Sequence, residues 1–371
     1  MKKERAWMEV DAQKLRDNYR NLCQFVKDTT CICVVKCNGY GHDAIAEANV
    51  LQNAGADWFA TACSEEAISL RTNGITGNIL ILGHTLPAQM DDLWKYHLTQ
   101  TVGDVAYGLA LASYCRKNNR CVDVHLKIDT GMHRLGIRPD TPMEETGKLF
   151  TAEGIRVTGC FSHFATADST NTEDVAFVYG QQKRFAEWLK TCREYGYNPG
   201  MTHISASAAI VNYPECSYEA CRPGILLLGF DSGYMKHPYN RTPVMSLKSR
   251  IAKLDVLQPG ETIGYGRTYT AKRTMRIATI PIGYGDGIPR NYPKGEVLIR
   301  GTRCPLVGRI SMDQLCVDVT HLTDVCLFEE TVIIGKQGTE EIRLSEMAEK
   351  AGTIANEIAT KITGRIPRFY N

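Results

Sequence analysis

The chain has 371 residues, 43% of them hydrophobic, and its 43 Lys and Arg side chains nearly balance 41 Asp and Glu, giving a formal net charge of +2. This length exceeds what one ordinary core holds, so we expect two domains. No segment concentrates basic residues as a groove for a phosphate backbone would, so nucleic acid is not an expected partner. The most apolar segment, 224–230, is far shorter than the roughly 20 residues that cross a bilayer, so we expect no membrane segment in this chain.

The 14 cysteines include no C-x-x-C pair, and Cys33, Cys63 and Cys160 lie inside apolar runs, where free buried cysteine is common. We therefore predict reduced thiols, a cytoplasmic protein and no metal site. The N-terminus, MKKERAWMEVD, carries acidic residues where a secretory signal has its apolar run. Its abrupt start on a strand-like segment is compatible with a fragment of a longer protein.

Short apolar or β-branched runs alternate with helix-like segments through the first 230 residues. Eight of them are strand candidates: 31–37, 57–63, 78–84, 98–104, 121–129, 156–164, 201–207 and 222–230. Eight strand and helix units predict an α/β fold, a closed parallel (β/α)8 barrel of the TIM type. A doubly wound open sheet is the alternative, but the first of these strands ends in KCNGYGH and not in the Gly-rich turn GxGxxG.

The pattern changes near residue 240, where short strands joined by Gly and Pro turns begin. These runs cover 245–260, 261–271, 275–287, 295–301 and 315–319, and helix-like segments at 344–352 and 353–364 follow. We predict a barrel over residues 1–240 and a mainly antiparallel β domain over residues 241–371. The strand-like residues at the N-terminus could also join the second domain.

Polar side chains follow the ends of the predicted barrel strands, where reactive groups lie in such barrels. Lys36 follows the apolar run CICVV, and desolvation there lowers the pKa of an ammonium and frees the nucleophilic amine. The string RPGI at 222–225, beside Ser207, offers backbone N–H groups and a hydroxyl that could hold a phosphate. Read alone, Lys36 could be an exposed rim residue, and Gly224 could mark a bend in the eighth strand. His203 also lies at a strand end, without an evident role.

Seven separated motifs, in order and over nearly the whole chain, resemble those of the alanine racemase family. They are VVKCNGYGH at 34–42, KIDTGMHRLG at 127–136, SHFATAD at 162–168, CRPGI at 221–225, GYGRTY at 264–269, PIGYGDG at 281–287 and GRISMDQ at 308–314. The resemblance implies an amino-acid racemase that uses pyridoxal phosphate. It also implies a homodimer whose active sites lie between one barrel and the other chain's β domain.

By this resemblance, Lys36 attaches the cofactor and serves as one proton-transfer base, and Tyr265 from the partner subunit is the second. Racemisation removes a Cα proton from one face and delivers one to the opposite face, which a single base cannot do. Arg222 corresponds to the arginine that faces the pyridine nitrogen, and because arginine stays protonated, that nitrogen should stay unprotonated. His163 corresponds to a histidine beside the ring that links Tyr265 towards Arg222, although it could instead be a packed strand-end residue.

The remaining site positions are also carried over from the resemblance. Four residues match phosphate contacts: Tyr40, Ser207, Gly224 and Ile225. Arg134 and Met312 match positions near the cofactor oxygen and the substrate carboxylate, and Tyr284 matches a substrate contact. Lys127 matches a lysine that many relatives carbamylate, and a carbamate would fix Arg134. Otherwise Lys127 could pair with a carboxylate such as Asp129.

The chain departs from the family at the substrate entrance. Asn356 stands where ordinary alanine racemases have a tyrosine that closes the entrance and touches the phosphate. The smaller amide leaves volume and a polar group, which favours the hydroxymethyl of serine over the methyl of alanine. This substitution is similar to that in the vancomycin-resistance serine racemases, whose catalytic part follows a membrane-embedded domain. We therefore predict a serine and alanine racemase that supplies D-amino acids for peptidoglycan precursors, with Asn356 at both the cofactor and the substrate.

Three alternatives stay open. If Asn356 is drift, the chain is a housekeeping alanine racemase with little serine activity. A non-catalytic pyridoxal phosphate carrier has the barrel but no β domain, which residues 241–371 with Tyr265 argue against. A basic amino-acid decarboxylase pairs a related barrel with a β domain, but it places a carboxylate at the ring nitrogen, where this chain has Arg222. Further departures at Ser311, His133 and Ala206 concern only the fine geometry of the site.

Overall fold

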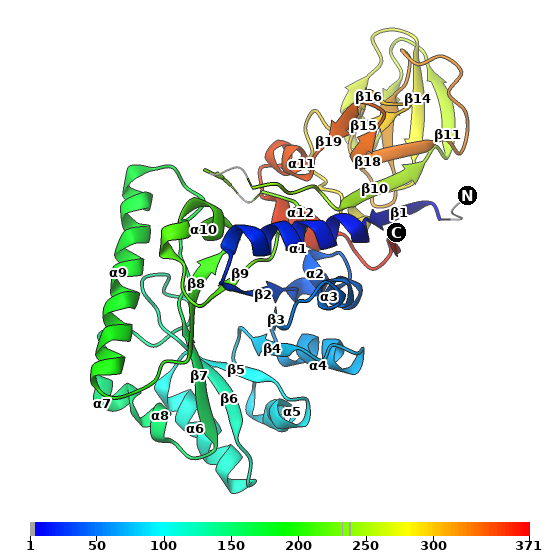
Figure 1. The fold of residues 1–371 in the computed structure, drawn as a ribbon. Coiled ribbons are helices and arrows are strands. Elements are labelled where there is room, and N and C mark those ends of the chain that lie inside the picture. Colours follow the sequence, from blue (N-terminus) through cyan, green and yellow to red (C-terminus); the bar gives the residue numbers. More distant parts are fainter. Residues whose placement is uncertain (1–3, 232, 237–238) are drawn as a thin grey trace.

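The computed structural model describes residues 4–371 apart from 232 and 237–238. One domain is a closed barrel of eight parallel strands with helices outside it, and the second is built mainly from antiparallel strands (Figure 1). The predicted barrel and β domain are thus confirmed. The barrel strands are β2 Thr30–Val34, β3 Trp58–Thr61, β4 Asn78–Ile81, β5 Thr99–Val102, β6 Val122–Lys127, β7 Ile155–Phe161, β8 Met201–Ala206 and β9 Ala220–Arg222.

Capping residues define where several barrel helices begin. The side chains of Asp11, Asp104 and Asn171 accept hydrogen bonds from backbone N–H groups in the first turns of three helices, α1, α6 and α9. The helices of this domain are α1 Ala12–Val26, α2 Lys36–Tyr40, α3 Ala44–Asn53, α4 Ser64–Thr72, α5 Met90–Lys95, α6 Val105–Lys117, α7 Met143–Thr146, α8 Lys148–Thr151, α9 Thr172–Glu194 and α10 Ser207–Asn212.

The eighth strand is shorter than predicted, and the expected strand at 222–230 is wrong. β9 ends at Arg222, and the apolar residues after it form consecutive turns, in which Leu227 and Leu228 donate N–H bonds to carbonyls three residues earlier. Both side chains are fully buried. An apolar run signals burial, and burial alone does not distinguish a strand from a buried turn.

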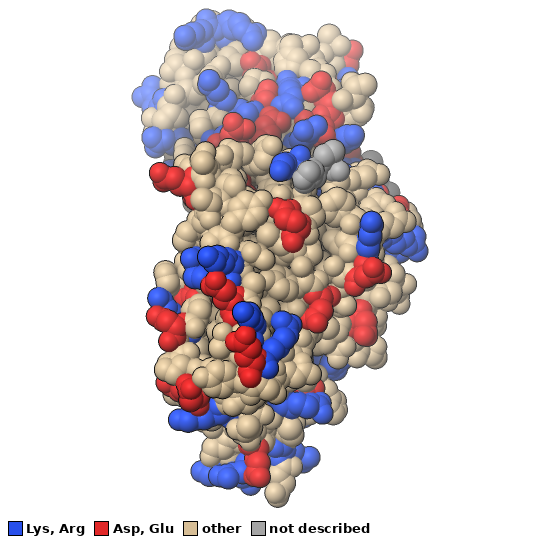
Figure 2. Space-filling view, turned by 60° about the vertical axis from the view of Figure 1, so that its left-hand side comes forward, with Lys and Arg blue, Asp and Glu red and all other residues tan. Residues whose placement is uncertain are grey.

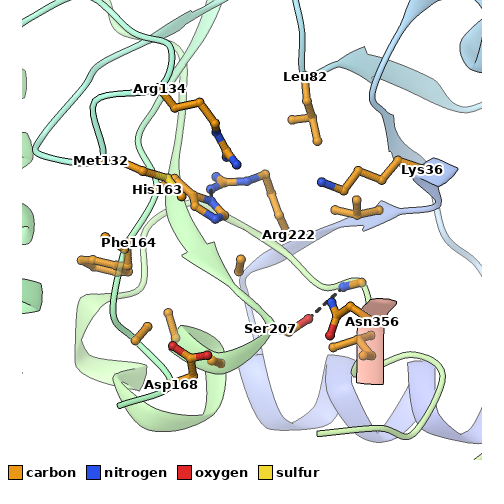
Figure 3. Close-up of a pocket in the computed structure, with 18 of the residues that line it drawn as sticks. Lys36, Leu82, Met132, Arg134, His163, Phe164, Asp168, Ser207, Arg222 and Asn356 are labelled. Atoms are coloured by element: carbon orange, nitrogen blue, oxygen red, sulfur yellow. Dashed lines mark hydrogen bonds between the residues drawn. The ribbon is translucent and has the colours of Figure 1, made fainter. Parts of the chain in front are cut away.

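Alternate residues of the barrel strands point outward to the helices and inward to the barrel axis. Cys33 and Phe59 face outward into the main core, whereas Ile32, Val34 and Ala60 belong to a small apolar cluster inside the barrel. Near the carboxyl ends of the strands, the side chains become polar and line the cavity drawn in Figure 3. The fold therefore gathers the predicted reactive residues at one mouth of the barrel.

The second domain contains both ends of the described chain. β1 (Ala6–Val10) pairs antiparallel with β10 (Met245–Arg250) and parallel with β20 (Arg368–Tyr370), so the two termini lie close together in Figure 1. The other elements are β11 Lys253–Leu257, β12 Thr262–Ile263, β13 Tyr269–Thr270, β14 Met275–Ile280, β15 Glu296–Ile299, β16 Thr302–Pro305, β17 Leu315–Asp318, β18 Glu330–Gln337, β19 Glu340–Ile342, α11 Leu344–Ala351 and α12 Ala355–Lys361.

The surface mixes charges of both signs. Lys and Arg side chains lie among Asp and Glu on the face drawn in Figure 2. None of the helices in the described residues combines the length and the low charge needed to span a membrane. All fourteen cysteines lie in the described part of the chain, and each is free.

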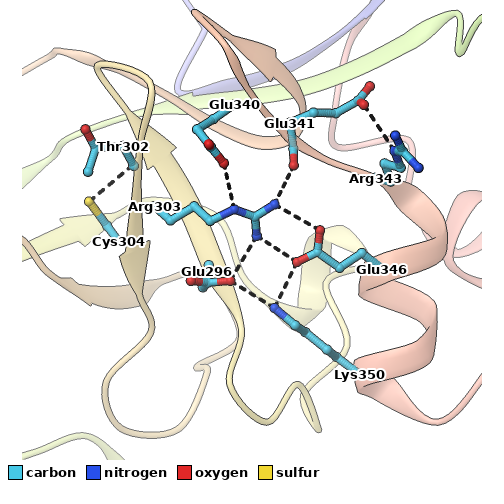
Figure 4. A network of polar contacts seen from close by, with 9 residues as sticks. All are labelled: Glu296, Thr302, Arg303, Cys304, Glu340, Glu341, Arg343, Glu346 and Lys350. Atoms are coloured by element: carbon cyan, nitrogen blue, oxygen red, sulfur yellow. Dashed lines mark hydrogen bonds and ion pairs between the residues drawn. The ribbon is translucent and has the colours of Figure 1, made fainter.

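A network of ion pairs fixes α11 against the strands of the second domain (Figure 4). The Arg303 guanidinium in β16 donates hydrogen bonds to the carboxylates of Glu296, Glu340 and Glu346 at 2.8–3.2 Å. Lys350 joins Glu296 to Glu346 at 3.0 and 2.9 Å. The hydrogen bond from Arg303 lowers the pKa of Glu346 to about 2.

We predict that Glu346→Gln lowers the free energy of unfolding at pH 7 by about 1–2 kcal/mol, because it removes a charge-assisted hydrogen bond. The pKa of Glu346 is lower in the folded chain than its ordinary value near 4.5, so its contribution is present above pH 4.5 and is lost as the pH falls towards 2. Urea unfolding at pH 7 and at pH 4 measures the change. Glu341→Gln is the control, because among the described residues its carboxylate pairs only with Arg343, whose side chain is exposed, and such a pair should contribute under ~0.5 kcal/mol. Equal effects of the two substitutions would contradict the prediction.

Candidate active site

The largest concentration of predicted residues lies in a cavity of about 690 Å³ at the barrel mouth. Strand ends and the loops after them form most of its wall, and Ile354 and Asn356 reach it from the second domain beside α12. Ten of the predicted site residues line it: Lys36, Tyr40, Lys127, Arg134, His163, Ser207, Arg222, Gly224, Ile225 and Asn356.

A left-handed turn follows Lys36 directly. Cys37, Asn38, Gly39 and Tyr40 have φ between 49° and 61°, a conformation that costs free energy for residues other than glycine. Side chains and packing hold the turn in place: Glu66 accepts a hydrogen bond from the Cys37 N–H at 2.7 Å, and Asn38 caps the Ala44 N–H at 3.0 Å. The turn places the Tyr40 hydroxyl close to Gly224 in the cavity wall.

Tyr40, Ser207 and Gly224 meet at one end of the cavity. The Ser207 hydroxyl accepts a hydrogen bond from the Gly224 N–H at 3.0 Å, as the dashed line in Figure 3 shows. A Cβ on Gly224 would lie 2.5 Å from the Tyr40 hydroxyl oxygen, so only glycine allows these groups to approach so closely. Two hydroxyls and nearby backbone N–H groups form a donor set suited to an anion.

Several hydrogen bonds hold Arg222 in the cavity wall. Its Nη1 lies 2.6 Å from His203 Nδ1, and its Nη2 contacts the Ser162 and Ile204 carbonyl oxygens at 2.7 and 2.9 Å and His163 Nδ1 at 3.0 Å. Burial lowers the pKa of Arg222 to about 9, still above neutral pH, so the side chain remains a cation. No hydrogen bond joins its Nε–H to any of the described residues, which leaves that donor for a ligand.

The contact with Arg222 fixes the protonation of His163. Arginine has only donors, so His163 Nδ1 must accept and its proton must lie on Nε2. Burial first, and then the charge of Arg222, lower the pKa of His163 well below its ordinary value, so the ring is neutral. His163 therefore presents an N–H donor away from Arg222.

Two lysines in the cavity have lowered basicity. Burial lowers the pKa of Lys36, as the apolar run before it led us to expect, and Figure 3 shows its amine opposite Arg222 and His163. Burial, followed by the charges of Arg134 and Arg222, lowers the pKa of Lys127 to about 8. No ion pair joins Lys127 to Asp129 among the described residues. Instead, Asp129 accepts hydrogen bonds from the backbone N–H groups of Gly131 and His133.

Asn356 lies at the same end of the cavity as Ser207 (Figure 3). Its Oδ1 atom is buried and accepts no hydrogen bond from the described residues. A buried acceptor without a donor is unfavourable, so this atom is a position where a ligand or a water could donate.

Three predicted residues lie outside the cavity of their own chain. Tyr265 begins a 3₁₀ turn at Tyr265–Arg267 and is 68% exposed, and Met312 is 53% exposed. Tyr284 begins another 3₁₀ turn and is 38% exposed. None of the three lines the cavity at the barrel mouth. Large apolar side chains with this exposure in one domain are typical of a contact surface.

The sequence analysis predicted no role for His125 or His203. Both are buried inside the barrel beneath Arg222, His203 on β8 and His125 on β6. The signal was present in the strand period, because His125 precedes Lys127 by two residues and therefore points to the same inner face. An inward-facing histidine in an apolar strand needs a polar partner.

These groups fit pyridoxal phosphate, which has an anionic phosphate, an aldehyde that reacts with a lysine amine, and a ring nitrogen. Tyr40, Ser207 and the Gly224 backbone would hold the phosphate, and Lys36 would supply the amine. The free Nε–H of Arg222 would face the ring nitrogen. Such a cofactor supplies an electron-withdrawing ring that makes the Cα proton of a bound amino acid acidic.

Comparison with known proteins gives the same family over both domains. The family model "Alanine racemase, N-terminal domain" matches residues 10–232, and "Alanine racemase, C-terminal domain" matches residues 244–370. An alanine racemase of Halothermothrix orenii is 38% identical over 367 residues, covering 98% of this chain and 96% of the relative. Alanine racemase 1 of Clostridium acetobutylicum is 37% identical, covering 98% and 95%.

Solved structures agree. The alanine racemase of Clostridium difficile 630 superposes with a TM-score of 0.93 at 33% identity, covering 100% of this chain and 97% of the other. That of Bacillus anthracis with bound L-Ala-P gives 0.90 at 32% identity, covering 100% and 96%. The chain therefore belongs to the alanine racemase family of pyridoxal-phosphate-dependent amino-acid racemases, which act on small amino acids and are typically dimeric.

Proposed function

We propose that this racemase interconverts the L and D forms of both serine and alanine. The observation that carries the proposal is the buried, unpartnered Oδ1 of Asn356 in the cavity wall. The hydroxyl of serine could donate to this oxygen, whereas the methyl of alanine could not. Such a bond would favour serine without excluding the smaller alanine. The predicted roles in peptidoglycan supply and vancomycin resistance, and the cytoplasmic location, stay predictions.

The alternative is an alanine racemase with little serine activity. The relatives reported above are all named alanine racemases, which supports it. The two proposals differ only in what Asn356 contributes, so a change at that residue separates them.

We infer that Lys36 and Tyr265 are the two proton-transfer bases, one on each face of the substrate. Lys36 is suited to the task because burial lowers the pKa of its amine. Tyr265 would come from the partner subunit, since in its own chain it is exposed and away from the cavity. The Nε2–H of His163 would then donate to the tyrosine oxygen, and Met312 and Tyr284 would reach the substrate from the same partner surface. Arg134, lining the cavity, would bind the substrate carboxylate.

We infer that Lys127 is carbamylated. The pKa near 8 leaves part of the amine neutral at physiological pH, and a neutral amine adds to carbon dioxide with release of one proton. The carbamate would replace a cation beside Arg134 and Arg222 by an anion, and so turn repulsion into attraction.

The first prediction concerns substrate choice. Asn356→Tyr should lower kcat/KM for L-serine at least ~10-fold and change that for L-alanine less than ~3-fold, because it removes both volume and the acceptor. Asn356→Leu is the matched control, since it keeps the branched shape of the side chain without the amide and should also lose serine activity. Racemisation of both substrates by the purified holoenzyme measures the effects. If the unchanged chain racemises alanine but not serine, only the proposal of an alanine racemase remains.

The second prediction concerns the shared site. Homodimers of Lys36→Ala and of Tyr265→Phe should each be nearly inactive, and subunit exchange between them should restore about one quarter of the unchanged activity. Half of the randomly mixed dimers are mixed pairs, and one of their two sites has both bases. Mixing Lys36→Ala with Arg222→Lys should restore nothing, because both residues line one chain's cavity. Failure of the first mixture to recover would place both bases on one chain.

The third prediction concerns Lys127. Holoenzyme supplied with ¹³C-labelled carbon dioxide should show a carbamate resonance in its ¹³C NMR spectrum, and Lys127→Arg should lack it. At a constant concentration of dissolved carbon dioxide, the signal should grow from pH 7 to pH 9, because the neutral amine becomes the main form above a pKa of about 8. An identical spectrum from the Lys127→Arg variant would refute the modification.

A further inference from the structure

Three buried side chains form a hydrogen-bonded row that runs from the cavity wall into the barrel. Arg222 Nη1 lies 2.6 Å from His203 Nδ1, and His203 Nε2 lies 3.0 Å from His125 Nδ1. Both histidine side chains have no exposed surface. Neither lines the cavity, and His203 reaches it through its hydrogen bond with Arg222 and through the ring of Phe161, on which it stacks.

The direction of the hydrogen bonds in this row of side chains follows from Arg222. Its guanidinium can only donate, so His203 Nδ1 accepts and the His203 proton lies on Nε2. That proton is donated to His125 Nδ1, so the proton of His125 lies on its own Nε2. Burial lowers the pKa of His125 to about 3 and that of His203 well below its ordinary value, so both rings are neutral and each carries one proton.

The environment of His125, at the far end of this hydrogen-bonded row, is unfavourable. His125 Nε2 is buried and has no hydrogen-bond partner among the described residues, so its N–H donor is left unsatisfied. The strand beside it makes room for the ring, because a Cβ on Gly159 would lie 2.6–2.7 Å from its atoms. An apolar side chain at position 125 would avoid the unsatisfied donor. Within the part of the chain that the structure describes, the hydrogen bond that the His125 side chain makes is the one it accepts from His203.

We propose that His125 is a positioning residue that holds Arg222 against the cofactor by fixing the tautomer and the ring orientation of His203. Without an acceptor at position 125, the His203 ring loses its anchor and can turn its Nδ1 away from the guanidinium. Arg222 then loses one of the four hydrogen bonds that hold its guanidinium among the described residues. The direction of its Nε–H towards the cofactor is then no longer fixed. This inference rests on the proposed assignment of Arg222 to the ring nitrogen.

The tautomers can be measured without altering the chain. In holoenzyme with ¹⁵N-labelled histidine, long-range ¹H–¹⁵N correlation spectra should show His125 and His203 neutral and protonated on Nε2 from pH 6 to pH 9. Spectra of a His125→Asn variant assign the two rings. A His203 proton on Nδ1, or a cationic His203 ring, would overturn the proposal.

A matched pair of variants tests the consequence. His125→Asn places an amide oxygen near the position of Nδ1, whereas His125→Leu has almost the same volume and no acceptor. The leucine variant should lose about 10-fold or more in kcat with little change in KM, while the asparagine variant stays within about 3-fold. The leucine variant alone should also shift the pH at which the visible absorption of the bound cofactor changes, and raise the rate of transamination relative to racemisation. If both variants behave alike in these readouts, His125 only fills space.

Arg222→Lys separates this inference from the assignment beneath it. If the cofactor absorption and the ratio of transamination to racemisation do not change in that variant, the assignment of Arg222 to the ring nitrogen fails. If they change there while the two His125 variants remain indistinguishable, only the role of His125 is refuted.

Discussion

The buried guanidinium of Arg222 is the charge around which the site is organised. A cation without solvent is stable only when its donors are satisfied, and here two carbonyl oxygens and two histidine nitrogens accept from it. Among the described residues, no carboxylate is one of its hydrogen-bond partners. The positive charge is therefore not neutralised within the wall, and it acts on everything that enters the cavity.

This uncompensated charge explains several properties of the cavity together. It lies near Lys36, Lys127 and Arg134, and the mutual repulsion of these cations adds to burial in lowering the pKa values of the two lysines. The same field attracts a phosphate and a carboxylate, the two anionic groups that the reaction brings in. Burial and, after it, this charge lower the pKa values of His163 and His203 and keep both rings neutral, so each relays a hydrogen bond in the direction set by the guanidinium.

The sequence predicted the barrel and most of the cavity residues because both follow from local patterns. Strand ends of a closed parallel barrel meet at one mouth, so the sequence pattern alone places Lys36, His163 and Arg222 together. The prediction was wrong for 222–230, where strong hydrophobicity reflects buried turns. Strands β16 and β18–β20 were not predicted. Their pairing joins segments far apart in the chain, and such partners leave no local period to detect.

Within the site, the sequence could not supply what depends on contacts between distant strands. The order of hydrogen bonds through His203 and His125 depends on the registers of β6 and β8 with β7, the strand that lies between them. The unsatisfied Asn356 oxygen depends on how α12 of the second domain meets the barrel mouth. The exposure of Tyr265 likewise could be known only once the second domain was placed beside the cavity.

The pairing of the first strand with the last has a consequence for how the protein is made. The central sheet of the second domain needs β1, which is synthesised before the barrel, and β20, which is synthesised after it. The barrel strands all precede residue 223 and can close while synthesis continues. One edge of β1 must wait unpaired until β20 has been synthesised. The second domain, and with it the surface that carries Tyr265, is therefore completed only after the barrel.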